Sequence, residues 1–220
     1  MTQLHQLPLF LGIDRRNMQE IVAHTRFDFR KAQAGETVIG QGQPMTHLVI
    51  LISGSIHATR QADNHRYTIT ETLAAPALIH PEHLFGLHPH YPRTITAATP
   101  LHLVAISKED VLRLTQQNLI IQLNLNNIIA TLAQKAMHQH WRATPSTLAQ
   151  RITRFIETRC THPAGEKTIR ITRQHLAEEL HEDRRLITKT LDTMQSQGLL
   201  QATRGIIHIP ALEKLISLAP

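Results

Sequence analysis

The sequence contains a single cysteine, Cys160, and this scarcity excludes several classes of protein. One cysteine cannot build a disulfide framework within the chain, a cysteine-rich zinc site or a cysteine-ligated iron–sulfur cluster. No apolar run approaches the roughly 18 residues of a membrane span. The N-terminus also lacks a basic stretch followed by an apolar core. We therefore expect a soluble, cytoplasmic protein that does not contact membranes, with a structural role for Cys160.

Signatures of catalysis are also missing from the chain. No glycine-rich phosphate loop, nucleophile elbow or carboxylate pair argues for an enzyme, so we expect no catalytic residues. Histidine, in contrast, is abundant, with 16 in 220 residues, and four crowd one stretch: His80, His83, His88 and His90. Spacings such as His80/His83 and His88/His90 are not specific without carboxylate or cysteine partners, so we expect no metal site, and haem or metal sensing is the alternative. The sequence identifies no cofactor.

The chain is basic, with a formal net charge of +6 and a pI of about 10.0. Such a balance suits a polyanionic partner. Residues 144–220 hold 11 Lys and Arg against 8 Asp and Glu, and residues 1–143 hold 12 against 9, so each part carries +3. The position of the basic residues, rather than their number, must therefore identify the interface.

Short strands are the dominant pattern between residues 27 and 106. Gly54 ends the first strong run, and the Asp63-Asn64 pair is a hairpin turn signal. The expected strands cover residues 47–53, 55–60, 67–73, 94–97 and 101–106. Closely spaced short strands of this kind predict a small β-roll or jelly roll within an N-terminal domain of residues 1–117.

A helical period replaces the strand pattern after Ser107, which can cap a helix. Residues 118–142 then predict one long helix with a single apolar stripe at steps of four, three and four. The stripe consists of Ile121, Leu125, Ile128 and Leu132. Two arrangements fit it: packing on the chain's own β-domain, or pairing with the same helix of a second copy. We favour the second, a parallel homodimer with this stripe as its interface.

The strongest local signal lies in the predicted C-terminal domain, residues 143–220. A helix opened by Thr172, a tight turn and a second helix capped by Asp183 are followed by a hairpin around Thr203-Arg204-Gly205. The second helix presents basic residues in its first two turns, as a recognition helix in the major groove does. This order of elements predicts a winged helix-turn-helix that binds DNA. The expected DNA contacts are Thr172, Arg173, Arg184, Arg185, Thr188, Lys189 and Arg204. The alternative is a ligand-binding or protein-interaction module whose basic helix contacts no DNA.

These residues resemble the Crp/Fnr superfamily of transcription regulators, named after the cyclic-AMP receptor protein and the fumarate-and-nitrate-reduction regulator. The resemblance runs from about Leu9 to Pro210, through turn points such as Gly35-Glu36 and Gly54-Ser55. It is strongest in the string Ile171-Thr172-Arg173-Gln174 and in the later Gly198-Leu199-Leu200. It implies an α+β architecture: a cyclic-nucleotide-binding-like β-roll, a long dimerisation helix and the winged helix-turn-helix.

The resemblance also points to an effector pocket. Family members that bind cyclic nucleotides carry a cassette that opens with Gly-Glu and closes with Arg-Ser or Arg-Thr. Here Glu82, Arg93 and Thr94 match it, but the opening glycine is Pro81, which has no N–H to donate to a phosphate. Leu84 also stands where related cassettes keep a small residue. We therefore expect a small effector other than cyclic AMP, with double-stranded DNA, a second copy of the chain and RNA polymerase as partners.

Overall fold

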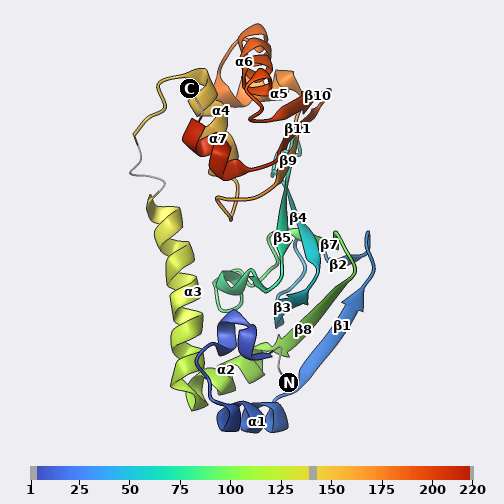
Figure 1. The fold of residues 1–220 in the computed structure, drawn as a ribbon, viewed down its shortest axis with the longest axis vertical. Coiled ribbons are helices and arrows are strands. Elements are labelled where there is room, and N and C mark those ends of the chain that lie inside the picture. Colours follow the sequence, from blue (N-terminus) through green and yellow to red (C-terminus); the bar gives the residue numbers. More distant parts are fainter. Residues whose placement is uncertain (1–3, 139–142, 219–220) are drawn as a thin grey trace. The chain divides into compact units, whose positions relative to one another are not determined.

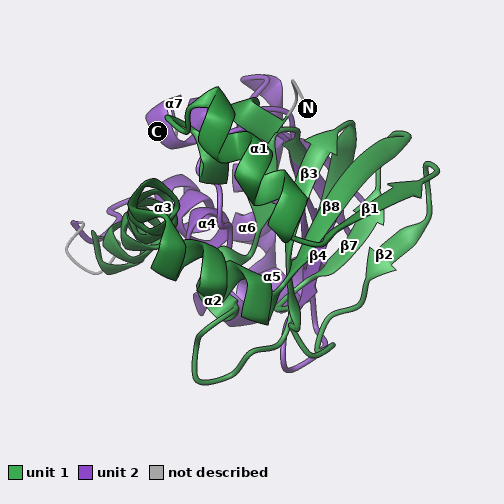
Figure 2. Ribbon diagram, turned by 90° about the horizontal axis from the view of Figure 1, so that it is seen from below, with its two compact units in different colours: residues 1–57, 73–138 green, residues 58–72, 139–220 purple. Residues whose placement is uncertain are grey.

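The computed structural model describes residues 4–138 and 143–218, which form two compact units (Figure 2). Unit 1 comprises residues 1–57 and 73–138, and unit 2 comprises residues 58–72 and 139–220. The sequence-based boundary near residue 142 is therefore incomplete, because residues 58–72 group with the C-terminal part of the chain. This grouping depends on strand pairing between residues far apart in sequence.

Two sets of strands build the β-roll of unit 1 (Figure 1). Four strands pair in the order β1-β8-β3-β6, and β2 pairs with β7. The strands are β1 (Phe27–Ala32), β2 (Thr37–Ile39), β3 (His47–Ser53), β6 (Ala77–Ile79), β7 (Thr94–Ala97) and β8 (Leu101–Ser107). β3 lies between β8 and β6, and its residues 48–51 are all buried and apolar rather than alternating, as in a strand whose two faces are both covered.

β4 (Ser55–Gln61) and β5 (Thr68–Ala74) connect the two units along the chain, since each has residues in both. Besides these strands, the described residues of unit 1 form six helical segments. They are η1 (Leu4–Gln6), η2 (Pro8–Phe10), α1 (Arg15–His24), η3 (Pro81–His83), α2 (Lys108–Gln117) and α3 (Leu119–His138). The predicted cap at Ser107 is confirmed, because its hydroxyl accepts from the Asp110 N–H at 3.0 Å.

Helix α3 packs against η2, η3 and α2 of its own unit. Ile121 is 0% exposed and Leu125 is 5% exposed, while the Asn124 amide donates to the carbonyls of Leu9 and Leu11. The expectation that the whole stripe faces a second copy is therefore wrong for Ile121 and Leu125, which are already covered by their own unit. The end of the predicted helix, residues 139–142, lies outside the described residues.

In the described part of unit 2, four helices and the strands β10-β11-β9-β5, paired in that order, pack around an apolar core. Its helices are α4 (Leu148–Glu157), α5 (Arg173–Leu180), α6 (Arg184–Ser196) and α7 (Leu212–Leu218). Its further strands are β9 (Lys167–Arg170), β10 (Gln201–Thr203) and β11 (Ile206–Ile209). Sequence analysis did not anticipate α7, whose Leu212 and Leu215 complete the core.

Candidate nucleic-acid interface

Local hydrogen bonds fix the start of both helices in the α5–turn–α6 segment. The Thr172 hydroxyl accepts from the His175 N–H at 3.1 Å, and the Asp183 carboxylate accepts from the Arg185 N–H at 2.6 Å. Between them, His181 ends α5 in the left-handed conformation, with φ of 52°. Both predicted caps are confirmed, and α6 is anchored by the burial of Ile187, Leu191 and Met194.

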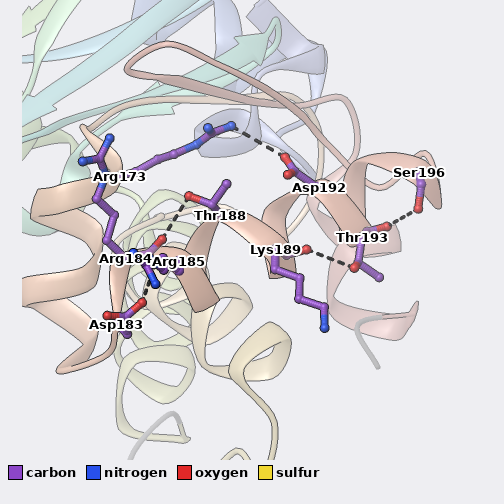
Figure 3. Close-up of a pocket in the computed structure, with 9 residues that line it drawn as sticks. All are labelled: Arg173, Asp183, Arg184, Arg185, Thr188, Lys189, Asp192, Thr193 and Ser196. Atoms are coloured by element: carbon purple, nitrogen blue, oxygen red, sulfur yellow. Dashed lines mark hydrogen bonds and ion pairs between the residues drawn. The ribbon is translucent and has the colours of Figure 1, made fainter.

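The exposed side of α6 forms an open hollow of about 820 Å³ (Figure 3). Five of the seven predicted DNA-contact residues line it together: Arg173, Arg184, Arg185, Thr188 and Lys189. The other lining residues are Asp183, Asp192, Thr193 and Ser196. Sequence analysis missed the last three. The spacing of four residues from Thr188 to Asp192 and on to Ser196 was a signal that they share a face.

The charge of this hollow is positive. Of its two carboxylates, Asp183 caps α6 and Asp192 lies 3.7 Å from the Arg173 guanidinium. The Asp192 side chain is 62% exposed and the Arg173 side chain is 36% exposed. An ion pair this exposed contributes little and yields easily to a stronger partner. Among the described residues, no carboxylate pairs with the side chain of Arg184, Arg185 or Lys189. These cations are therefore available to an anionic ligand.

The hydroxyls in the hollow are used differently. Thr188 donates to the Arg184 carbonyl at 2.9 Å, and Thr193 donates to the Lys189 carbonyl at 3.0 Å (Figure 3). Both bonds tie the hydroxyls to the backbone of their own helix. The guanidinium and ammonium groups therefore supply the hydrogen-bond donors that point away from α6.

The β10–β11 hairpin lies beside this helix and carries exposed Arg204 in its turn. Gly205 has φ of 79° there, a conformation that glycine adopts without strain. The Gln195 side chain of α6 accepts from the Ala202 N–H at 2.7 Å, and the Ile171 N–H donates to the Gly205 carbonyl at 3.0 Å. These bonds fix the hairpin to α6 and to Ile171, which precedes the Thr172 cap of α5, and Arg204 is not among the residues that line the hollow.

The three predicted effector residues lie in unit 1. Arg93 is buried at 4% exposure, and the Thr94 hydroxyl accepts from the Gln41 N–H at 3.1 Å. Glu82, in η3, accepts from His80 at 3.1 Å. Burial would raise the pKa of Glu82, but the hydrogen bond and the charge of His80 outweigh it and hold the pKa below its usual range.

Pro81 and Leu84 occupy this region as the sequence suggested. Pro81 is the first residue of η3, and Leu84 is 0% exposed at its end. Leu84 therefore fills space within the domain rather than bordering an open pocket. In the described part of the chain, no three His, Cys, Asp or Glu side chains are placed to hold a metal ion. Nor is any described helix long and apolar enough to cross a membrane.

Comparison with known proteins agrees with this geometry. The family model of the cyclic nucleotide-binding domain matches residues 29–118, although a search of curated proteins found no match. A protein from Eubacterium rectale described as a transcriptional regulator of the Crp/Fnr family is 22% identical, with a TM-score of 0.55 over 97% of this chain and 98% of that one. The chain has the fold of the Crp/Fnr regulators.

Two further structures support this fold assignment. The c-di-GMP responsive global regulator CLP of Xanthomonas campestris is 20% identical, with a TM-score of 0.53 over 90% of this chain and 99% of that one. The catabolite activator protein of Thermus thermophilus is 17% identical, with a TM-score of 0.51 over 96% of both chains. The likeness in fold to these regulators thus extends over nearly the full chain, and residues 29–118 form an α+β region that matches the cyclic nucleotide-binding domain.

Proposed function

We propose that this protein is a homodimeric, sequence-specific DNA-binding transcription regulator. The observation that carries the proposal is the exposed hollow on α6, where Arg184, Arg185 and Lys189 lie together without carboxylate partners among the described residues. In this proposal α5, α6 and the β10–β11 hairpin form a winged helix-turn-helix. A helix fits the major groove, where arginine and lysine recognise guanine O6 and N7.

The roles of the basic residues follow from their positions. Arg184 and Arg185 begin the helix and would read base edges, together with Lys189 one turn later. Arg204 would contact a phosphate, and Thr172 would hold the first helix of the motif in place. Arg173 would exchange its pair with Asp192 for a phosphate, since an ion pair this exposed contributes little.

Fluorescence anisotropy on duplexes selected from a random library tests the proposal. Replacing Arg184 and Arg185 with alanine should abolish selective binding, and wild-type affinity should fall steeply with salt. The matched control replaces exposed Arg15 and Arg16 of α1, which lowers net charge equally in unit 1. Equal losses of DNA affinity in the Arg184/Arg185 and Arg15/Arg16 double variants would favour nonspecific charge attraction. No duplex binding by the wild type would favour a protein-interaction module.

The dimer in this proposal forms through the side of α3 opposite its buried stripe. There Leu119 and Leu123 are 67% and 50% exposed, and Met137 is 67% exposed. Together with exposed Ala130, they recur at steps of four, seven and seven, which is the spacing of a coiled-coil seam. Ile128 and Leu132 are half-buried and lie on the same side of α3 as the buried Ile121 and Leu125, so they are not part of this proposed interface.

The proposed effector is a small molecule other than cyclic AMP. Pro81 removes one donor, and Leu84 fills space beside η3. The fold itself is compatible with other effectors, because the similar Xanthomonas regulator is described as responsive to c-di-GMP. RNA polymerase is the partner expected of a transcription regulator with this architecture.

A further inference from the structure

The tip of the β4–β5 hairpin, residues 58–72, packs within unit 2. β5 pairs antiparallel with β9, from Thr68 opposite Arg170 to Glu71 opposite Lys167. The other side of β9 pairs with β11, so β5 covers an edge that would otherwise present unpaired backbone groups. A strand from the N-terminal half of the sequence thus completes the sheet that carries the β10–β11 hairpin.

Side chains of the hairpin belong to the same core as the DNA-contacting helices. Ile69 is 2% exposed and lies in the apolar core of unit 2 with residues of α4 and α6. The ring of Tyr67 packs against Phe155 of α4, with ring centroids 5.4 Å apart. Arg159 lies over the Phe155 ring at 3.8 Å and donates to the Tyr67 hydroxyl at 2.7 Å. The hairpin is therefore packed as well as paired.

Glu71 forms a buried polar centre where β5 meets β9. Its two carboxylate oxygens accept from the backbone N–H groups of Thr161 and His162, each at 3.1 Å. Lys167 Nζ lies 3.8 Å from Glu71 Oε1 and donates to the Ala164 carbonyl at 2.7 Å, and the side chains of both ionic partners are at most 1% exposed. A carboxylate suits this position because both of its oxygens are acceptors, whereas an amide offers only one.

We infer that residues 58–72 are an integral part of the DNA-binding unit and that Glu71 is the positioning residue that holds them on β9. Removing one partner of a buried ion pair leaves an uncompensated charge, so release of the hairpin is strongly disfavoured. The exposed contacts of the same hairpin, such as the Arg66–Glu178 pair at 2.8 Å, are 42–49% exposed and contribute much less. Calling unit 2 the DNA-binding unit rests on the proposed function, whereas the attachment of the hairpin to β9 does not.

Hydrogen–deuterium exchange on the full-length protein tests the inference without DNA. In Glu71→Gln, we expect the β9 amides that face β5, at Thr168 and Arg170, to exchange at least about a hundredfold faster than in the wild type, because successive N–H groups of a central strand point to opposite neighbours. Arg66→Ala is the matched control on the same hairpin, and should change these rates by less than about threefold. Lys167→Met should also accelerate exchange of the β9 amides. In the Glu71→Gln, Lys167→Met double variant, the increase in exchange rate should be smaller than the product of the two single increases.

If Glu71→Gln unfolds all of unit 2, a disulfide cross-link between β5 and β9 still tests the inference. Thr70 and Thr168 are directly opposite in the pairing, so Thr70→Cys with Thr168→Cys, in a Cys160→Ser background, should oxidise readily to a disulfide. That disulfide should slow β9 exchange again when Glu71→Gln is added. Wild-type exchange in Glu71→Gln, or failure of the two cysteines to cross-link, would overturn the inference. Absence of duplex binding would overturn the proposed function alone.

Discussion

The two faces of α3 predict two different outcomes from the same kind of substitution. On the exposed face, Leu123→Glu combined with Met137→Glu should prevent association while leaving unit 1 folded. On the buried face, Leu125→Glu should destabilise unit 1 itself, because Leu125 is 5% exposed within its own unit. Introducing a carboxylate there places a charge in an apolar core, which it cannot enter without a large cost.

The exposed fractions set the size of the first effect. Burying a whole leucine or methionine side chain is worth about 1.5–3 kcal/mol. Leu123 is 50% exposed and Met137 is 67% exposed, so each contributes about 1–2 kcal/mol when a second copy covers it. A symmetric dimer contains four such positions, and the double variant therefore loses at least about 4 kcal/mol, or about a thousandfold in dissociation constant.

Sedimentation velocity at micromolar concentration measures this change, and thermal unfolding checks the fold. Gln122→Glu, which adds the same charge at an exposed position between the two faces, should leave both the dimer and the melting temperature unchanged. A Leu123→Glu, Met137→Glu protein that remains dimeric would refute the proposed interface. So would a folded, monomeric Leu125→Glu protein, because it would return the interface to the stripe first expected from the sequence.

Three further outcomes test the site, the effector and the packing of unit 1. Arg204→Ala should weaken binding to all duplexes alike and reduce the salt slope by about one, whereas Arg184→Ala should relax the preference at one base position per half-site; equal effects across a site library would contradict this division. Calorimetric titration with cyclic AMP should detect no low-micromolar binding, and such binding, abolished by Arg93→Ala, would restore the ordinary cyclic-nucleotide mechanism. Burial raises the pKa of Tyr91 to about 12, above its usual value near 10, so the stability it supplies is complete below pH 10 and is lost as the pH rises toward 12. Urea unfolding should show that the free energy of unfolding falls by about 1.4 kcal/mol between pH 8 and pH 11, and that this loss is absent in Tyr91→Phe. The same dependence of the free energy of unfolding on pH in both proteins would exclude Tyr91 as the cause.

Features that depend on neighbouring residues were predictable from the sequence. The caps at Ser107, Thr172 and Asp183 each need an acceptor and an N–H two or three residues later, and all three form. The basic face of α6 was equally accessible, because helical spacing alone brings Arg185 and Lys189 to one side. These elements carry their own signal in a window of a few residues.

Features that depend on pairing between distant segments were not predictable in this way. Nothing in the alternation of residues 67–73 distinguishes a strand that closes the N-terminal roll from one that pairs with β9, nearly one hundred positions later. The prediction of the dimer interface on helix α3 was wrong for a related reason. Its buried and exposed stripes are both apolar, so a search for one seam finds the stronger pattern, and only burial of Ile121 shows which face the domain already covers.

The hairpin has a consequence for how an effector would act. β4 and β5 each have residues in both units, so a change in unit 1 that shifts these strands must either carry β9 with them or break the contacts of Glu71. Breaking a buried ion pair costs about 3–5 kcal/mol, whereas effector coupling is typically about 1–3 kcal/mol. We therefore expect the hairpin and the sheet of unit 2 to move as one body when an effector binds. In Glu71→Gln the effector should still bind, but DNA affinity should lose most of its response to it; an unchanged response, measured by anisotropy with and without effector, would show that the signal does not pass through this hairpin.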